Sequence, residues 1–177
     1  MARQYFQDGP FLDPPVASGT PLVSTSIEPL WVALTYTPIY PNDAKAGKIY
    51  CVRAGGIMST GASGTLIITP LLTATALGVS QTVTVPINMT AVPWFLEFDL
   101  VWRTIGGAGA SSTCIGTGYF ATAPFTSAPA AGIACVIPFG GTLATVDATI
   151  IEAIGISKTL SVAGSMTLQY VYCFSRN

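Results

Sequence analysis

The stretch PWFLEFDLVWRT, residues 93–104, constrains the fold of this chain most strongly. One parity of the stretch carries large apolar side chains: Trp94, Leu96, Phe98, Leu100 and Trp102. The other parity carries Phe95, Glu97, Asp99, Val101 and Arg103. A two-residue period is typical of a β-strand with one buried and one exposed face, whereas a helix would mix both sets around its circumference. At about 3.4 Å per residue the two tryptophans lie roughly 27 Å apart, so we predict one long strand around which the other elements pack.

Shorter β-type segments occupy the rest of the chain and are separated by turn residues. We predict strands at 30–37, 48–60 with a bend or bulge at 55–56, 64–72, 81–88, 112–122, 133–137, 141–148, 150–156 (a strand or a single helical turn) and 166–175. No β-α-β alternation and no run of strong helix formers interrupts them, which indicates an all-β protein. We therefore predict a single jelly-roll domain, a β-sandwich of about 8–10 antiparallel strands.

The last predicted strand also alternates. Its larger apolar side chains share one parity, which we expect on one face of the sheet: Met166, Leu168, Tyr170, Tyr172 and Phe174. A long final strand that lies centrally in its sheet would fit a jelly roll. An immunoglobulin-like sandwich fits less well, because the usual Cys-Trp-Cys spacing is absent.

Residues 1–29 differ from the rest of the chain. Prolines punctuate this segment at positions 10, 14, 15, 21 and 29. Each proline fixes φ near about −65° and removes a hydrogen-bond donor, so we predict an extended arm in front of a domain at 30–177. A solvated tail and a docking arm both fit this composition. The aromatic and apolar content favours a docking arm, with candidate contacts at Arg3, Gln4, Tyr5, Phe6, Phe11 and Leu12.

Charged side chains are scarce in this sequence. Seven Lys and Arg and eight Asp and Glu make up 8% of the chain, against about 25% in ordinary soluble domains. None of them lies between Thr104 and Val146. A compact monomer of this mass exposes roughly 8,000 Å², which leaves about one charge per 540 Å². We infer that other protein covers much of the surface.

The composition argues against several function classes. The chain has no histidine, so a Ser-His or Cys-His nucleophile is impossible. Cys51, Cys114, Cys135 and Cys173 form no CxxC pair; we expect reduced, buried thiols, although their spacing leaves disulfides open. The cationic side chains are dispersed and the net charge is −1, which predicts no nucleic-acid partner. No apolar run is long enough for a membrane helix. We expect no cofactor, no membrane partner and no enzymatic activity.

Glu97 and Asp99 are the candidate chemical groups that the pattern brings onto one face, about 7 Å apart. Two carboxylates can serve glycoside hydrolysis or bind calcium. No third acidic ligand is near in sequence, so a surface charge pair explains them more simply. With Arg103 they supply three of the fifteen charges. We predict a contact between subunits on this face, formed by Phe95, Glu97, Asp99, Val101 and Arg103.

Several motifs resemble small structural proteins of tailed bacteriophages, usually described as minor structural or head decoration proteins. The resemblance lies in GKIY (47–50), AGGIMSTG (54–61) with GTLIITP (64–70), TAVPW (90–94), SVAGS (161–165) and QYVY (169–172). It covers about residues 45–177 and leaves the arm outside.

The resemblance implies a jelly-roll subunit that forms homotrimers on the capsid surface and reinforces contacts between major capsid proteins. We therefore expect a capsid decoration, or cement, protein in the virion, assembled in the host cytoplasm. The alternative is a receptor- or glycan-binding head or tail fibre domain, which would take a host-surface glycan as its partner.

Overall fold

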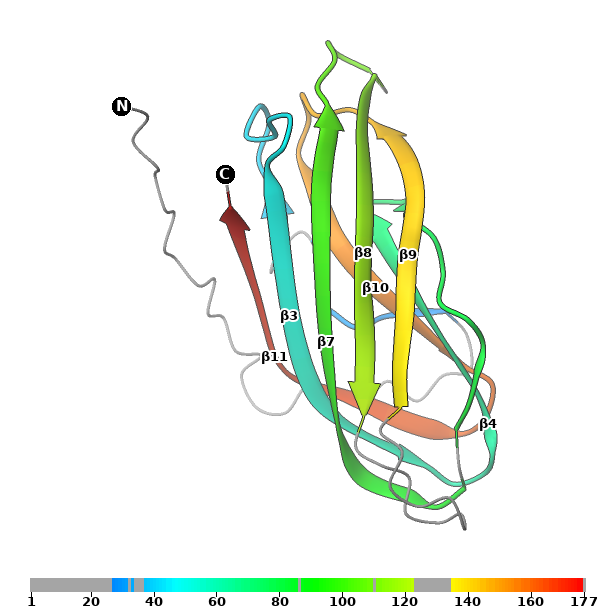
Figure 1. Ribbon diagram of the computed structural model, residues 1–177. Helices are drawn as coiled ribbons and strands as arrows, with labels where there is room; N and C mark the ends of the chain where they lie inside the picture. The colour runs from blue at the N-terminus through cyan, green and yellow to red at the C-terminus, as the bar shows by residue number, and fades with distance from the viewer. Residues whose placement is uncertain are drawn as a thin grey trace.

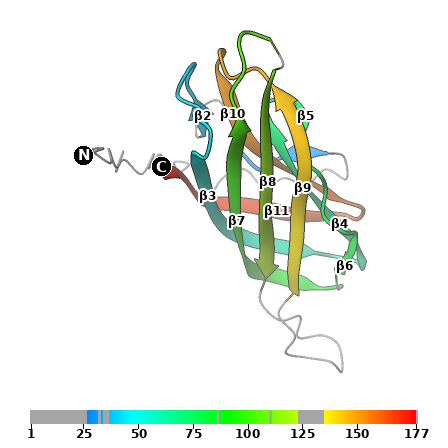
Figure 2. The ribbon, with the colours of Figure 1, turned by 45° about the horizontal axis from the view of Figure 1, so that its top comes forward.

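The computed structural model describes residues 27–31, 33, 37–85, 87–109, 111–122 and 135–176. Within these ranges the chain forms two antiparallel β-sheets that face each other (Figures 1 and 2). The predicted all-β sandwich class is thereby confirmed. In the part of the chain that is described, no helix is long and apolar enough to cross a membrane.

One sheet consists of five long strands in the order β11-β3-β7-β8-β9. Its strands are β3 (Ile49–Thr60), β7 (Met89–Thr104), β8 (Ser112–Thr122), β9 (Cys135–Val146) and β11 (Gly164–Arg176). Both ribbon views show β3, β7, β8 and β9 side by side on one layer (Figures 1 and 2). We call this layer the five-stranded sheet.

The opposite sheet is built on β10 (Glu152–Leu160) and β4 (Gly64–Leu72). Short strands flank this pair: β1 (Glu28–Pro29) and β2 (Pro38–Ile39) pair with β10, and β5 (Thr75–Ala76) and β6 (Val83–Val85) pair with β4. Pro70 lies in β4 between the segments that pair with β5 and β6. A proline is tolerated there because no neighbouring strand needs its missing N–H, as the sequence predicts for an edge.

The central strand β7 confirms the predicted spine of the core. Trp94, Leu96, Phe98, Leu100 and Trp102 are all 3% exposed or less, and the intervening side chains are half-buried or exposed. Phe98 stacks on Phe139 of β9, with ring centroids 5.8 Å apart. Side chains on one face of β7 therefore fill the space between the sheets, while the other face points outward.

A two-stranded ribbon runs through both sheets. In the five-stranded sheet β3 pairs with β11, and after the short connections 61–63 and 161–163 the same chain segments continue as the pair β4 and β10. This arrangement places β11 at the edge of its sheet, next to β3 only. The expectation of a central final strand is therefore wrong.

The strand predicted at 30–37 also differs from the structure. The described residues of the range 30–37 are not in a strand. Leu30, Trp31 and Thr37 lie in bends, and the Thr37 N–H donates to the carbonyl of Ala33 at 2.8 Å, a turn contact that an extended strand cannot make. The Trp31 indole N–H lies 3.0 Å from the Thr37 hydroxyl and 3.1 Å from the Ile154 carbonyl oxygen, so burial of this ring overrides the local strand propensity.

The segments predicted as two strands at 133–137 and 141–148 form the single strand β9 over their described residues. Gly140 and Gly141 have φ of 91° and 90°, and the pairing with β8 slips by one residue there. Glycine adopts this conformation without strain, so a bulge carries the strand through the glycines that the sequence suggested as a break.

The prediction that one parity of the last strand lies on one face is wrong beyond a second bulge, which lies in β11. Leu168 pairs with Gly56 and Tyr170 pairs with Gly55, so Gln169 is an extra residue on β11. An extra residue moves every later side chain to the opposite face. Met166 and Leu168 are buried as predicted, but beyond the bulge Val171 and Cys173 are the buried residues. Tyr170, Tyr172 and Phe174 therefore lie on the outer side of the sheet.

The predicted arm falls almost entirely outside the described residues, including its candidate contacts Arg3, Gln4, Tyr5, Phe6, Phe11 and Leu12. Its last residues, Glu28 and Pro29, pair with Lys158 and Ser157 of β10. The Glu28 carboxylate lies 2.7 Å from the Lys158 ammonium, which is completely buried. Glu28 thus compensates a buried charge of the sandwich.

Candidate functional site

The outer face of the five-stranded sheet brings residues from five strands into regular cross-strand rows. One row consists of Tyr172, Arg53, Glu97, Tyr119 and Pro138. The rows on either side of it run from Tyr170 to Val136 and from Phe174 to Gly140. This surface, which we call the outer face, contains the predicted residues Phe95, Glu97, Asp99 and Val101 near its middle.

The outer face is unusually apolar for a solvent-facing sheet. Val136 and Leu143 are 58% and 59% exposed, and Tyr119 is 37% exposed. Phe95 and Tyr119 contact each other with ring centroids 6.1 Å apart, and Tyr170 stacks on Tyr172 at 5.3 Å. Antiparallel sheets with one face in water normally carry polar side chains there. An apolar face of this kind is typical of a surface that another protein covers.

One charged network lies within this apolar surface. The Arg53 guanidinium donates to one Glu97 carboxylate oxygen at 2.7 and 3.1 Å, and the Tyr119 hydroxyl donates to the other oxygen at 2.9 Å. The Arg53 hydrogen bond and then the Tyr119 hydrogen bond lower the pKa of Glu97 below its ordinary value. A general acid for glycoside hydrolysis needs a raised pKa. The network therefore fits a fixed polar contact better than acid catalysis.

Asp99 and Arg103 differ from Glu97 in their surroundings. Asp99 is half-buried, and its Oδ1 atom has no hydrogen-bond partner within the described residues. Arg103 is the extra residue at a slip in the pairing of β7 with β8, and its side chain is exposed without an ion pair to any described residue. The predicted set thus shares one side of β7, but only Glu97 belongs to the ion-paired network. Its role between subunits stays a prediction.

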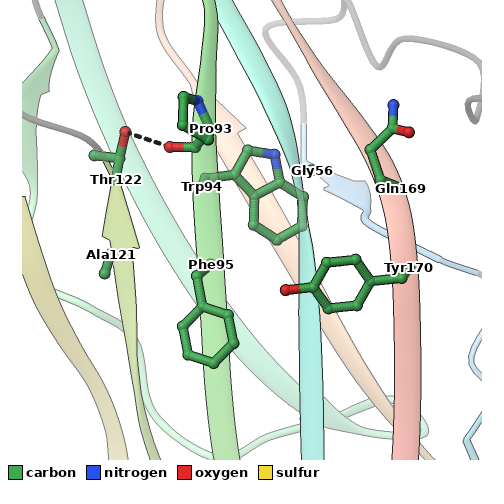
Figure 3. A pocket seen from close by; sticks show the side chains of 8 residues that line it. All are labelled: Gly56, Pro93, Trp94, Phe95, Ala121, Thr122, Gln169 and Tyr170. Carbon is green, nitrogen blue, oxygen red and sulfur yellow. Dashed lines mark hydrogen bonds between the residues drawn. The ribbon is translucent and has the colours of Figure 1, made fainter.

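A shallow hollow of about 410 Å³ opens at one end of the outer face, between β11 and β8 (Figure 3). Uncharged side chains line it: Gly56, Pro93, Trp94, Phe95, Ala121, Thr122, Gln169 and Tyr170. Figure 3 shows Tyr170 lying across β3 with its hydroxyl toward β7. The volume of the hollow falls within the range of small-molecule binding sites.

Two adjacent glycines of β3 allow close approaches of β11 beside this hollow. A Cβ atom on Gly55 would lie 2.4 Å from the Tyr170 hydroxyl oxygen, so only glycine lets the tyrosine ring lie on the strand. A Cβ atom on Gly56 would lie 1.9 Å from the Thr167 carbonyl oxygen and 3.0 Å from the Trp94 ring. The glycine pair, the Gln169 bulge and the aromatic side chain above it therefore form one local arrangement.

Three described cysteines are free thiols: Cys51, Cys114 and Cys173. All three are buried, and burial raises the pKa of each to about 12. For Cys51 the neighbouring Asp99 carboxylate adds to the effect of burial. A thiol with so high a pKa is a poor nucleophile and a poor metal ligand at neutral pH. The described residues contain no group of three or more His, Cys, Asp or Glu side chains that could hold a metal ion.

Sequence reasoning missed the β11 contribution to the outer face. In the sequence, Tyr170, Tyr172 and Phe174 continue the alternation that begins with Met166 and Leu168. No residue of this segment predicts a bulge at Gln169. The adjacent pair Gly55–Gly56 is the available signal, because glycines within a strand often mark a bulge or a close approach of a neighbouring strand. The glycines predict a bend on their own strand, whereas the bulge lies opposite them on β11.

Searches with the sequence and with the structure match this chain to no family model, no curated protein and no solved structure.

Proposed function

We propose that this chain is a virion structural protein of a tailed bacteriophage, a decoration or cement protein without catalytic activity. It assembles in the host cytoplasm, forms homotrimers on the capsid surface and stabilises the shell through contacts with the major capsid protein. The sandwich supplies the contacts between subunits, and the Pro-rich arm docks onto the shell.

The apolar outer face is the observation that carries this proposal. A free monomer would present to water an aromatic and aliphatic surface that holds one ion-paired network, Arg53 with Glu97. Interfaces between subunits combine such an apolar area with a few well-paired polar groups. In a shell, copies of this protein and other shell proteins would cover this surface.

The proposal includes the jelly-roll topology. The ribbon in which β3 and β11 continue as β4 and β10 supports it, because a jelly roll is a long antiparallel ribbon folded over itself. The sequential strands β7, β8 and β9 extend the ribbon on the β3 side, so β11 takes an edge position.

The experiment that tests the function combines two measurements on the full chain. Light scattering of the purified protein should give three times the 18.3 kDa chain mass. Quantitative mass spectrometry of purified virions should give copy numbers in the range of tens to hundreds, in proportion to the major capsid protein. A monomer that is absent from particles would overturn the proposal, and a few copies per particle would indicate a fibre domain.

Truncation of the arm tests its role in shell docking. A variant that lacks residues 1–26 keeps Glu28 beside the buried Lys158 and should keep the trimer mass, because it retains every described strand. Its binding to undecorated capsids in a co-sedimentation assay should be lost. A variant carrying Val79→Ser, an exposed substitution outside the arm and the outer face, serves as the control and should bind normally. Undiminished binding of the truncated protein would contradict the arm assignment.

A further inference from the structure

The hollow at the end of the outer face has the chemistry of a site for a proline-rich segment. Its lining is uncharged and includes the half-buried aromatic side chains Phe95 and Tyr170, whereas the Trp94 ring that borders it is only 3% exposed. The Gln169 amide and the Tyr170 hydroxyl have no hydrogen-bond partner within the described residues, and Gln169 is exposed on the bulge. A polyproline II segment has no internal hydrogen bonds, so its carbonyl oxygens can accept from such donors while its rings pack on the aromatic walls.

We propose that this hollow binds residues 10–15 of the same chain, Pro-Phe-Leu-Asp-Pro-Pro. The direction of β1 leads the arm to this site. Glu28 pairs with Lys158 and Pro29 with Ser157 in antiparallel register, so going back from Pro29 to Glu28 leads toward the Leu160 end of β10. Leu160 is followed by the connection 161–163 and then by β11, on which Gln169 and Tyr170 lie. The arm is therefore attached to the opposite sheet on the side of the corner that leads to the hollow.

The length of the arm is sufficient for this docking. The path from the level of Thr159 over the corner to Gln169 covers ten residues, or about 33 Å if fully extended. The twelve residue steps from Pro15 to Ile27 span about 37 Å in polyproline II geometry. The docked segment thus reaches its own hollow without a second copy. Because it is tethered, its effective concentration at the site is in the millimolar range.

The side chains of residues 10–15 match the hollow in polarity. Polyproline II has three residues per turn, so Phe11 and Pro14 fall on one side of the segment and Leu12 and Pro15 on the next. Pro10 and Asp13 share the third side, which can face water. The segment thereby presents apolar groups toward an uncharged wall and keeps its one charge away from it. The arm's first eight residues carry Arg3 and Asp8, and they match an uncharged hollow less well.

Docking at residues 10–15 would fix the base of the arm and leave Arg3, Gln4, Tyr5 and Phe6 available to the shell. Phe11 and Leu12, also named above as candidate shell contacts, would then bind the hollow instead. This consequence rests on the proposed function, since it orients the shell-binding residues. The docking itself needs no shell, so it can be tested on the free protein and can fail separately from capsid binding.

Photo-crosslinking in the full chain tests the docking. Phe95 is replaced by p-benzoylphenylalanine, and the cross-linked peptides are identified by mass spectrometry after mixing ¹⁵N-labelled and unlabelled protein before assembly. We expect cross-links to residues 10–15 within one isotopic species. The same probe at Val136, which is exposed on the outer face but does not line the hollow, is the control and should give no cross-link to residues 10–15. A second probe at Ala121, also in the lining, guards against disturbance of the aromatic wall.

Substitutions in the arm complete the test. Pro14→Ala with Pro15→Ala should lower the yield of the cross-link by about tenfold, whereas Pro21→Ala, outside the docked stretch, should leave it unchanged. Cross-links to residues 10–15 that join two isotopic species would assign the segment in the site to a neighbouring copy and overturn docking within one chain. The absence of any cross-link to residues 1–26 from both probe positions would overturn the proposal. A neutral oligosaccharide that bound in the hollow without lowering the cross-link yield would overturn it as well.

Discussion

Phe98→Ala should lower the free energy of unfolding by about 3–5 kcal/mol, the range for removing a buried phenylalanine ring. Phe98 lies at the centre of β7, is fully buried and stacks on Phe139. Its ring also fills the space above Gly116, where a Cβ atom would lie 2.2 Å from it. The surrounding side chains come from both sheets and cannot close over the cavity without shifting strands. Urea denaturation followed by tryptophan fluorescence measures the change.

Phe95→Ala is the matched control, because it removes the same ring from the same strand on the outer side. Phe95 is half-buried, so its loss should cost the isolated sandwich less than about 1.5 kcal/mol. In the proposed trimer the same change should instead weaken association, measured as a shift of the light-scattering mass with dilution. Equal destabilisation by both variants would contradict the assignment of the two faces of β7.

Gly56→Ala should destabilise the fold by about 3 kcal/mol or more, because overpacking against a rigid backbone exceeds the usual cost of an added methyl group. The new Cβ atom would lie 1.9 Å from the Thr167 carbonyl oxygen. Relief requires β3 and β11 to move apart next to the Gln169 bulge. Thermal unfolding monitored by circular dichroism would show a large loss of the melting temperature.

Gly55→Ala tests the neighbouring position, where an added methyl group would meet a side chain instead of the backbone. Here the obstacle is the Tyr170 ring, which is a side chain and can turn aside. Gly55→Ala alone should therefore cost less than Gly56→Ala, and the addition of Tyr170→Ala should remove most of its cost. Such a rescue is a coupling that a double-mutant cycle detects directly. A Tyr170→Ala background that rescued Gly56→Ala instead would contradict the arrangement of the hollow.

The outer face and the hollow, the two surfaces to which we assign proposed roles, differ in extent and chemistry. The outer face is broad and apolar, and its fixed network of Arg53, Glu97 and Tyr119 gives it polar specificity. The hollow is local, and the unusual backbone features of β3 and β11 converge on it. Both lie on the five-stranded sheet, so one rigid layer can serve contacts with other subunits and hold the arm.

The alternation of side chains in the sequence is sufficient to predict β7, β4 and β8. Each of these strands has one side chain set that must leave water, and the period of two follows from strand geometry alone. The same rule is enough to place Glu97, Asp99 and Val101 on one side of β7. It does not identify Arg53 or Tyr119 as the partners of Glu97, because cross-strand neighbours depend on register.

Register and bulges were decided only by the tertiary structure. The extra residue Gln169 turns Tyr170, Tyr172 and Phe174 outward, and it lies opposite Gly55 and Gly56 of β3. Gly140 and Gly141 carry β9 through a bulge instead of ending it, and the buried Trp31, where the sequence predicts a strand, lies in a bend. The all-β class, the long central strand and its two faces thus follow from local pattern in the sequence. The composition of the outer face and the hollow follows from the pairing of strands distant in sequence, where one inserted residue reverses the direction of every side chain beyond it.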